Sequence, residues 1–204
     1  AKALSDADAP IEGLERPIAK TRLIKQGAMQ ELLTGRRRLP GFSGEWEIKR
    51  LAEIGQVKTG LTYNPKNVSP YGTLVLRSSN IQNDRLAFAD NVFVDLDVSD
   101  EATVQFGDLL ICVRNGSRQL IGKTAMIDKR ADGMAFGAFM SAYRSDLNDY
   151  LIWCFQSSVI QKQVAEHLGA TINQITNKTL KAIEVPIPTD TQERAAISTV
   201  LHGI

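Results

Sequence analysis

The chain has 204 residues, enough for one hydrophobic core with an appended helix, and its 43% hydrophobic and 23% charged residues are ordinary for a globular domain. The net charge of +1 excludes a globally basic nucleic-acid-binding chain, so a DNA-binding face would have to be a local concentration of Lys and Arg. No apolar run approaches the about 20 residues that span a bilayer, and no signal peptide opens the sequence, so we expect a cytoplasmic protein without membrane contact.

The N-terminal segment has the pattern of a long helix that packs on a partner helix. Pro17 should kink or break this helix, because proline removes one backbone hydrogen bond. Gly35 supplies the C-terminal stop, and Arg36 to Arg38 favour the negative end of the helix dipole. The residues near heptad core positions, and hence the expected partner contacts, are Ile11, Leu14, Ile18, Ala28 and Leu32.

From Trp46 to about Arg144, short apolar runs alternate with turn residues, which predicts strands over residues 72–77, 91–94, 108–113 and 122–127. Residues 146–168 then predict one or two helices with an apolar face. Residues 183–187 predict an edge strand, because Pro186 cannot donate a hydrogen bond to a neighbouring strand. Asp190 and Glu193 predict a capping box at the start of a last helix over residues 192–201. The fold class is therefore α+β, a mixed globular domain with a long N-terminal helix and a C-terminal helix.

Motifs of catalysis are weak in this sequence. Residues 116–124 resemble a phosphate-binding loop, but five residues separate its glycines where that loop has four. Residues 64–66 resemble the start of an amino-methyltransferase motif without its second proline and aromatic residue. Cys112 and Cys154 lie in apolar runs without metal-ligand spacing, which predicts buried free thiols in a reducing compartment. We therefore expect no catalysis, no metal site and no cofactor in this chain.

Three polar loops are more informative, at residues 77–80, 114–118 and 170–178. Arginine pairs with guanine, asparagine with adenine, and serine with phosphates or bases, so such loops suit DNA recognition. From the residues alone, however, ordinary solvated turns are the more usual interpretation of Asn, Ser and Gly in loops. The candidate DNA contacts are Arg77, Ser78, Asn80, Arg114, Asn115, Ser117, Arg118 and Lys123, followed by Asn173, Gln174, Asn177 and Lys178.

The chain also resembles a known family, the specificity (S) subunits of type I restriction–modification enzymes. The most specific part is residues 25–35, Lys-Gln-Gly-Ala-Met-Gln-Glu-Leu-Leu-Thr-Gly, followed by Arg-Leu-Pro-Gly-Phe at 38–42 and by Trp46. Further similarity lies in Gly-Asp-Leu-Leu-Ile at 107–111, Asn-Gly-Ser at 115–117, Ile-Gly-Lys at 121–123, and the segments 172–180, 185–188, 192–193 and 196–197.

The resemblance implies an architecture. An S subunit is similar to two tandem copies of a recognition domain plus a helix, and the two helices pair antiparallel. This chain would be one half, resembling the second half and beginning inside the central spacer. It would comprise a spacer helix at 1–36, a target-recognition domain at 37–188 and the start of a second, truncated spacer helix at 189–204.

The resemblance also implies partners. Such subunits bind double-stranded DNA and direct methyltransferase (M) subunits, which methylate adenine with S-adenosylmethionine, and ATP-dependent restriction (R) subunits. The spacer would pair with a second half-subunit or with a second copy of this chain. The competing hypothesis is a protein-interaction or scaffold module, whose polar loops bind protein instead of DNA.

Overall fold

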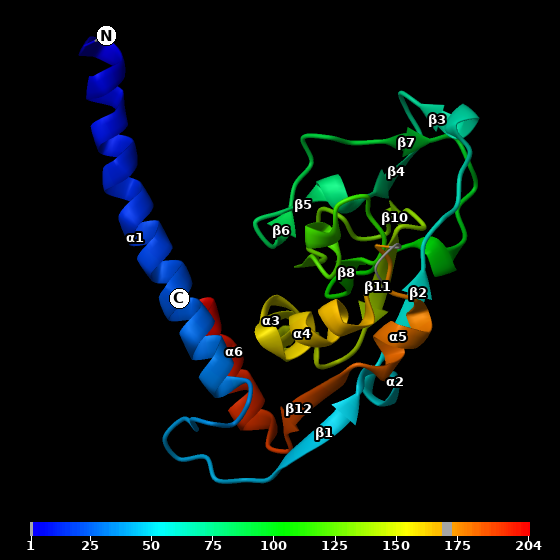
Figure 1. Ribbon diagram of the computed structural model, residues 1–204. Coiled ribbons are helices and arrows are strands. Elements are labelled where there is room, and N and C mark those ends of the chain that lie inside the picture. Colours follow the sequence, from blue (N-terminus) through cyan, green and yellow to red (C-terminus); the bar gives the residue numbers. More distant parts are fainter. Residues whose placement is uncertain (1, 169–172) are drawn as a thin grey trace.

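The computed structural model describes the backbone of residues 2–168 and 173–204, and within these ranges the side chains from residue 17 onward. Helix α1 (Lys2–Leu32) extends away from a globular part built of strands and shorter helices, and α6 (Thr191–His202) runs antiparallel beside the C-terminal half of α1 (Figure 1). The predicted α+β fold is confirmed.

Helix α1 is continuous over 31 residues, so of the predicted kink or break at Pro17 the break is wrong. A proline removes one backbone hydrogen bond, but the residues on both sides keep helical dihedrals. The helix ends at Leu32, and Gly35 follows with φ at +69°, as the stop signal predicted. Backbone bonds from Leu33 N to Met29 O and from Arg37 N to Glu31 O occupy the last carbonyls.

A two-stranded sheet connects the segment after α1 with the segment before α6. Strand β1 (Trp46–Arg50) pairs antiparallel with β12 (Glu184–Pro188), with Trp46 opposite Pro188. The predicted edge strand is thus confirmed, since β12 has a single neighbour in this sheet. The chain therefore enters and leaves the globular part at one place (Figure 1).

The core of the globular part is a four-stranded antiparallel sheet in the order β2 (Gln56–Thr59), β11 (Met140–Arg144), β8 (Leu109–Cys112) and β9 (Thr124–Met126). All residues of β8 are buried, as its continuous apolar run predicts. Two helices follow, α3 (Asn148–Gln156) and α4 (Ser158–His167), and Ser157 separates them by capping Val159 N with its hydroxyl.

A second four-stranded sheet has the order β10 (Ala135–Phe136), β4 (Thr73–Leu76), β7 (Phe93–Val94) and β3 (Val68–Ser69). A hairpin of β5 (Ile81–Gln82) and β6 (Arg85–Leu86) turns at Asn83 and Asp84, whose positive φ values of 49° and 61° match the twist of a two-residue hairpin loop. The remaining helices are α2 (Leu51–Ile54) and α5 (Asn177–Ala182), with short 3₁₀ turns at Pro65–Asn67, Ser78–Asn80, Asp100–Ala102 and Arg118–Leu120.

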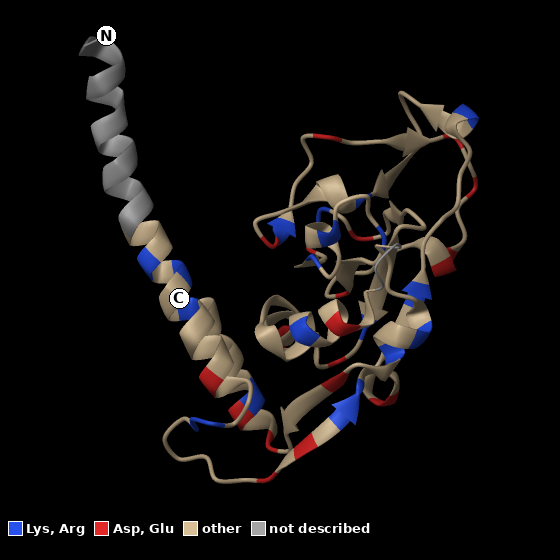
Figure 2. Ribbon diagram, viewed as in Figure 1, with Lys and Arg blue, Asp and Glu red and all other residues tan. Residues whose placement is uncertain are grey.

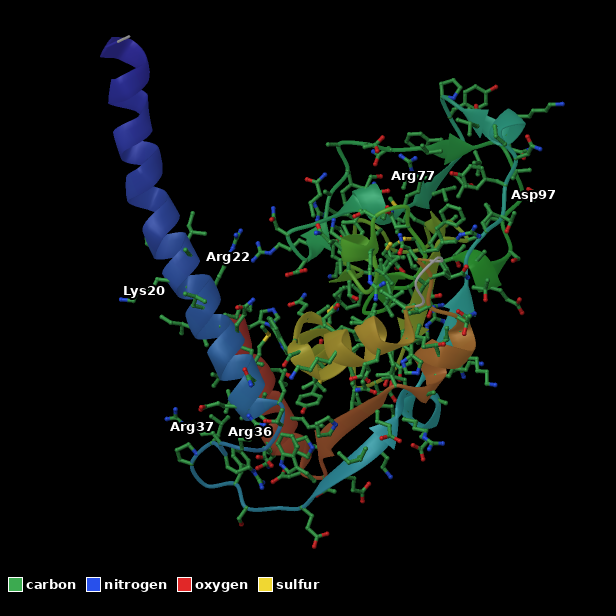
Figure 3. The ribbon with its side chains drawn as sticks, viewed as in Figure 1. Lys20, Arg22, Arg36, Arg37, Arg77 and Asp97 are labelled. Atoms are coloured by element: carbon green, nitrogen blue, oxygen red, sulfur yellow. The ribbon has the colours of Figure 1, made fainter. Side chains whose placement is uncertain are left out.

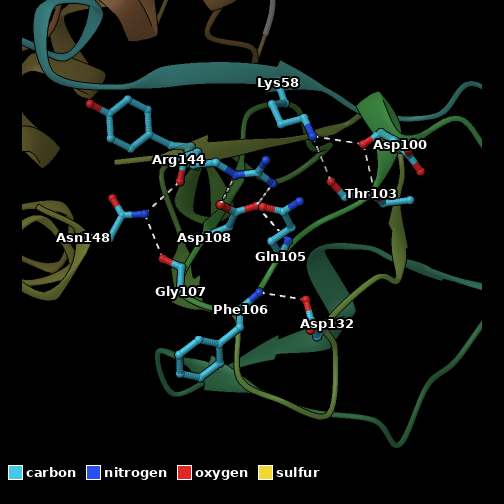
Figure 4. Close-up of polar contacts among 11 residues, drawn as sticks. Lys58, Asp100, Thr103, Gln105, Phe106, Gly107, Asp108, Asp132, Arg144 and Asn148 are labelled. Carbon is cyan, nitrogen blue, oxygen red and sulfur yellow. Dashed lines mark hydrogen bonds and ion pairs between the residues drawn. The ribbon is translucent and has the colours of Figure 1, made fainter. Parts of the chain in front are cut away.

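A partly buried ion pair joins β8 to β11, and the Asn148 side chain links the start of β8 to α3 (Figure 4). The Asp108 carboxylate, 3% exposed, accepts hydrogen bonds from Arg144 Nε at 2.8 Å and Nη2 at 2.7 Å. It also accepts from Gln105 N at 2.8 Å, while the Asn148 amide donates to Gly107 O at 2.8 Å. Gly107 has φ at +85°, a conformation that favours glycine. Residues 107 and 108 therefore have a structural function at the start of β8.

Both cysteines are buried free thiols, as predicted. Burial raises the pKa of Cys112 to about 11 and that of Cys154 to about 12. At pH 8 only about one thiol in a thousand or fewer is therefore the reactive thiolate. We expect Ellman's reagent to leave the native chain unmodified and to react with both thiols in 8 M urea. Rapid modification of either thiol without denaturant would contradict the buried placement.

Candidate nucleic-acid interface

The three polar loops predicted from the sequence meet in the folded chain. Asn115, which follows β8, donates its amide hydrogen to Ser78 Oγ at 3.0 Å, in the turn that follows β4. Its backbone N–H donates to Asn173 O at 3.3 Å, and the Asn173 amide donates to Gly116 O at 2.9 Å. Segments far apart in the sequence thus form one continuous surface, which we call the loop surface and define as residues 77–80, 114–118 and 173–178.

Backbone pairing holds the third loop in place. Arg114 and Gln174 form an isolated antiparallel bridge, and Ile175 N donates to Val113 O at 2.9 Å. Ile175 is buried and anchors this segment in the core. The position of residues 173–175 is therefore set by the end of β8. The other part of the predicted loop, residues 169–172, lies outside the described residues.

The charged residues of the loop surface are all cations, and Asp90, outside it, pairs with one of them, Arg77, at 3.0 Å. Its sequence contains Arg77, Arg114, Arg118 and Lys178 and no Asp or Glu, although the whole chain has a net charge of only +1. Arg114, Arg118 and Lys178 are exposed. Over the rest of the described ribbon, basic and acidic residues are interspersed (Figure 2). The loop surface is therefore a local concentration of cations suited to a phosphate backbone.

Arg114 is held in position by a neighbouring aromatic residue. Its guanidinium lies over the ring of Phe139, 4.8 Å from the centroid, and Phe139 is itself 55% exposed. Its backbone N–H donates to Phe139 O at 3.1 Å, so both ends of the residue are fixed by the same neighbour. A guanidinium stacked in this way keeps its planar set of donors oriented toward solvent or a ligand.

Asn80 does not fit the predicted base contact, because its side chain is fully buried. Its amide donates to Ala87 O at 3.0 Å and Asp90 O at 3.3 Å, and its Oδ1 accepts from Arg77 N at 2.9 Å. These bonds shape the turn after β4. Asn80 therefore positions Arg77 and Ser78 and does not reach the surface.

Asn177 has a similar supporting position. It lies in the first turn of α5, so the predicted loop is helical from this residue onward. Its amide donates to Thr59 Oγ1 at 2.8 Å, and its Oδ1 accepts from Ser141 Oγ at 3.1 Å. Asn177 thus links α5 to β2 and β11, whereas the next residue, Lys178, is exposed.

Three more candidates lie around the second loop. Arg118 is exposed, but its guanidinium donates to Ala165 O and Leu168 O, each at 3.3 Å, at the C-terminal end of α4. Ser117 is exposed, and its backbone N–H donates to Asn115 Oδ1. Lys123 is half-buried beside the end of β8, where its carbonyl accepts from Cys112 N at 2.9 Å. Arg118 therefore combines a structural contact with an exposed charge.

A cleft of about 520 Å³ adjoins the loop surface. Arg77, Ser78 and Ser79 line it on one side, and the residues after β10 line it on another. Phe139 borders both the cleft and Arg114. The sequence reasoning missed Phe139; an aromatic residue after the small residues Gly137 and Ala138, between two strands, was the available signal.

The expected partner contacts on α1 divide into three groups. Ile11 and Leu14 lie outside the residues whose side chains are described. Ile18 is 52% exposed, as an unpartnered contact would be. Leu32 is buried in the chain's own core and Ala28 packs against that core, because α6 folds back along this half of the helix. Leu32 is therefore not available to a second helix, whereas Ala28 is only partly buried.

Within the described part of the chain, no group of three or more His, Cys, Asp and Glu side chains could hold a metal ion. No helix among the described residues combines the length and the apolar character needed to cross a membrane.

The chain is similar to one known protein family and to several solved structures. Residues 43–203 match the family described as type I restriction modification DNA specificity domain. No curated protein matches the chain. The chain spans about half the length of the solved structures to which it is similar.

Three solved structures share the fold. The type I restriction–modification S subunit from M. genitalium is 16% identical, with a TM-score of 0.66 over 98% of this chain and 51% of that one. The HsdS subunit from Thermoanaerobacter tengcongensis is 18% identical, with a TM-score of 0.62 over 96% of this chain and 48% of that one. A third structure comes from work on complex assembly and conformational transition of the type I R-M system. It is 18% identical, with a TM-score of 0.63 over 96% of this chain and 49% of that one.

The family match extends from the loop after α1 to the last helix and includes all three polar loops. The resemblance inferred from the sequence is thereby confirmed, and the chain belongs to the family of type I restriction–modification DNA specificity domains.

Proposed function

We infer that this chain recognises one half of a split DNA target and so directs adenine methylation and restriction by a type I restriction–modification complex. The observation that carries this proposal is the convergence of three loops into one surface whose charged residues are all cations. Cations contact phosphates and fix the register, while Arg, Asn and Ser side chains contact base edges. Chemistry would belong to the partners, with S-adenosylmethionine in the methyltransferase subunit and ATP in the restriction subunit.

Assembly would use the exposed middle part of α1. Ile18, Leu23 and Ile24 are 52%, 69% and 52% exposed, which is unusual for large apolar side chains on one helix. Lys20 points away from the globular part and Arg22 toward it (Figure 3). Ile18 is also a predicted heptad contact, and we assign its face of α1 to a second spacer helix, from another half-subunit or from a second copy of this chain.

The first test is the salt dependence of DNA binding. If each of the three exposed cations of the loop surface, Arg114, Arg118 and Lys178, neutralises one phosphate, a plot of log K against log salt concentration should have a slope of about −2.7. Fluorescence anisotropy with random-sequence duplexes measures this slope without knowledge of the target. A flat salt dependence would favour the competing hypothesis, a protein-interaction module.

The second part of the test identifies the target. The chain is co-expressed with its methyltransferase subunit, and methyladenine is mapped over the host genome by single-molecule sequencing. A split, palindromic motif is expected if two copies pair through α1. Absence of any motif, with both proteins soluble and associated, would contradict sequence recognition by this chain as a symmetric pair.

A further inference from the structure

The cleft beside the loop surface is built as a binding site. Its volume of about 520 Å³ falls within the roughly 300–1,000 Å³ of small-molecule sites. Backbone bonds from Leu61 N to Phe136 O at 2.7 Å and from Ala138 N to Leu61 O at 2.9 Å hold one wall against the floor. The walls are largely apolar and include Tyr63, Val68 and Phe139.

Two polar groups of the cleft lack partners. Arg77 Nε and Ser79 Oγ are buried, and neither has a hydrogen bond to any described residue. The other end of the guanidinium is occupied, since Arg77 Nη2 lies 3.0 Å from Asp90 Oδ2. Buried donors without acceptors are rare because each loses its water without compensation. Arg77 and Ser79 both line the cleft, so a ligand that brings an acceptor would gain these donors once either side chain turns toward it.

The depth of Arg77 limits what this ligand can be. Arg77 lines the cleft, whereas Arg114 on the same surface is exposed and does not line it. Base edges lie at the floor of the major groove, so groups that contact them in a duplex must project from the protein. A recessed group can contact only what projects from the DNA, which is a backbone phosphate or a base outside the helix.

The charge and lining of the cleft favour the base. The Asp90 carboxylate neutralises Arg77 and would repel a phosphate at the same position. The apolar walls offer nothing to an anion, but they suit the faces of a planar heterocycle, which stacks on aromatic rings and carries acceptors on its edge.

We propose that this cleft binds a single nucleobase displaced from the DNA duplex, with its face against one of the aromatic lining residues, Tyr63 or Phe139, and its acceptor edge at Arg77 and Ser79. The binding of a nucleobase is inferred from the geometry of the cleft alone. That the base comes from duplex DNA rests on the proposed function. Asp90 is a positioning residue that holds the guanidinium.

The test uses neutral nucleosides as probes, so that phosphate contacts do not contribute. The full chain carries ¹³C labels in its methionine and valine methyl groups, and the four deoxynucleosides are titrated separately. We expect saturable shifts of the Met140 and Val68 signals, which report on the cleft, with a Kd on the order of millimolar. Deoxyribose 5-phosphate should leave both signals in place.

A matched pair of variants localises the binding. Ala138 is exposed and lines the cleft, so Ala138→Phe should fill it and weaken nucleoside binding about tenfold or more. Ala52→Phe makes the same change at an exposed position of α2, outside the residues that line the cleft, and should bind as the wild type does. Shifts that occur with the sugar phosphate but not with nucleosides, or that survive Ala138→Phe, would overturn the proposal.

A mismatch scan along the bound half-site then tests the duplex as the source. A mismatch lowers the free-energy cost of displacing a base. A duplex with a mismatch at one particular position should therefore bind the wild type more tightly than the matched duplex does, and Ala138→Phe should bind both duplexes equally. Nucleoside binding without such a position would overturn displacement from the duplex. If no duplex binds while nucleosides still occupy the cleft, the proposed function fails and the nucleobase site remains.

Discussion

Replacement of Arg114 by alanine should weaken binding of the target half-site by about 1–3 kcal/mol, or about 5- to 150-fold. The guanidinium is exposed, oriented by the Phe139 ring and surrounded by donors and acceptors of the loop surface. The alanine variant lacks the planar set of guanidinium donors, so it cannot make a base contact of this kind. Anisotropy titrations of the target and of a scrambled duplex at one salt concentration measure the effect.

Two variants separate the possible causes. Arg114→Lys keeps the charge but loses the planar fork, so it should recover scrambled-duplex binding and not target discrimination. Arg130→Ala removes a similarly placed arginine, exposed and 5.0 Å from the Phe88 ring but outside the loop surface, and should change neither. Equal losses with Arg114→Ala for target and scrambled DNA would identify Arg114 as a phosphate contact.

Replacement of Arg38 by alanine should destabilise the fold by about 3–5 kcal/mol. Glu193, at the start of α6, is fully buried, and Arg38 donates to both of its carboxylate oxygens, at 2.5 and 2.7 Å. Without Arg38 a buried carboxylate would remain without its cation, which is a far larger penalty than the loss of an exposed pair. Urea denaturation followed by circular dichroism measures the free energy of unfolding.

The neighbouring Arg37 provides the control. It is 76% exposed and lies 3.9 Å from the exposed Glu31 carboxylate, so Arg37→Ala should cost no more than about 1 kcal/mol. A double variant, Arg38→Met with Glu193→Leu, should recover most of the stability, because it removes both charges together. A single-variant loss as small as that of Arg37→Ala would show that Glu193 finds water or another partner.

The sequence predicted those helices and strands whose own residues have a clear apolar pattern or a stop signal. The four apolar runs of the middle region became strands β4, β7, β8 and β9, and Gly35 ended the first helix. Strand β11 was missed because its short sequence, which includes Ser141 and Ala142, has no clear alternation of apolar and polar residues. Pairing with β2 on one side and β8 on the other stabilises β11 as a strand.

Long-range contacts explain the other differences. Asp190 caps Gln192 N at 2.8 Å, as the capping box predicts, but Glu193 pairs with Arg38 instead of closing the box. Asn80 is a residue type that can pair with adenine, but its side chain is buried and its amide hydrogen-bonds within the turn after β4. The residue types of the three loops were visible in the sequence. Their convergence was not, because it depends on the strand order of two sheets.

The β1–β12 pair has a consequence for how such chains change over time. Because the chain enters and leaves the globular part through adjacent antiparallel strands, nearly everything between Arg50 and Glu184 is an insert with neighbouring ends. Domains with neighbouring ends can be exchanged without disturbing the framework that carries them. Recombination between β1 and β12 would thus replace one specificity by another, while the helices and their Arg38–Glu193 link stayed unchanged.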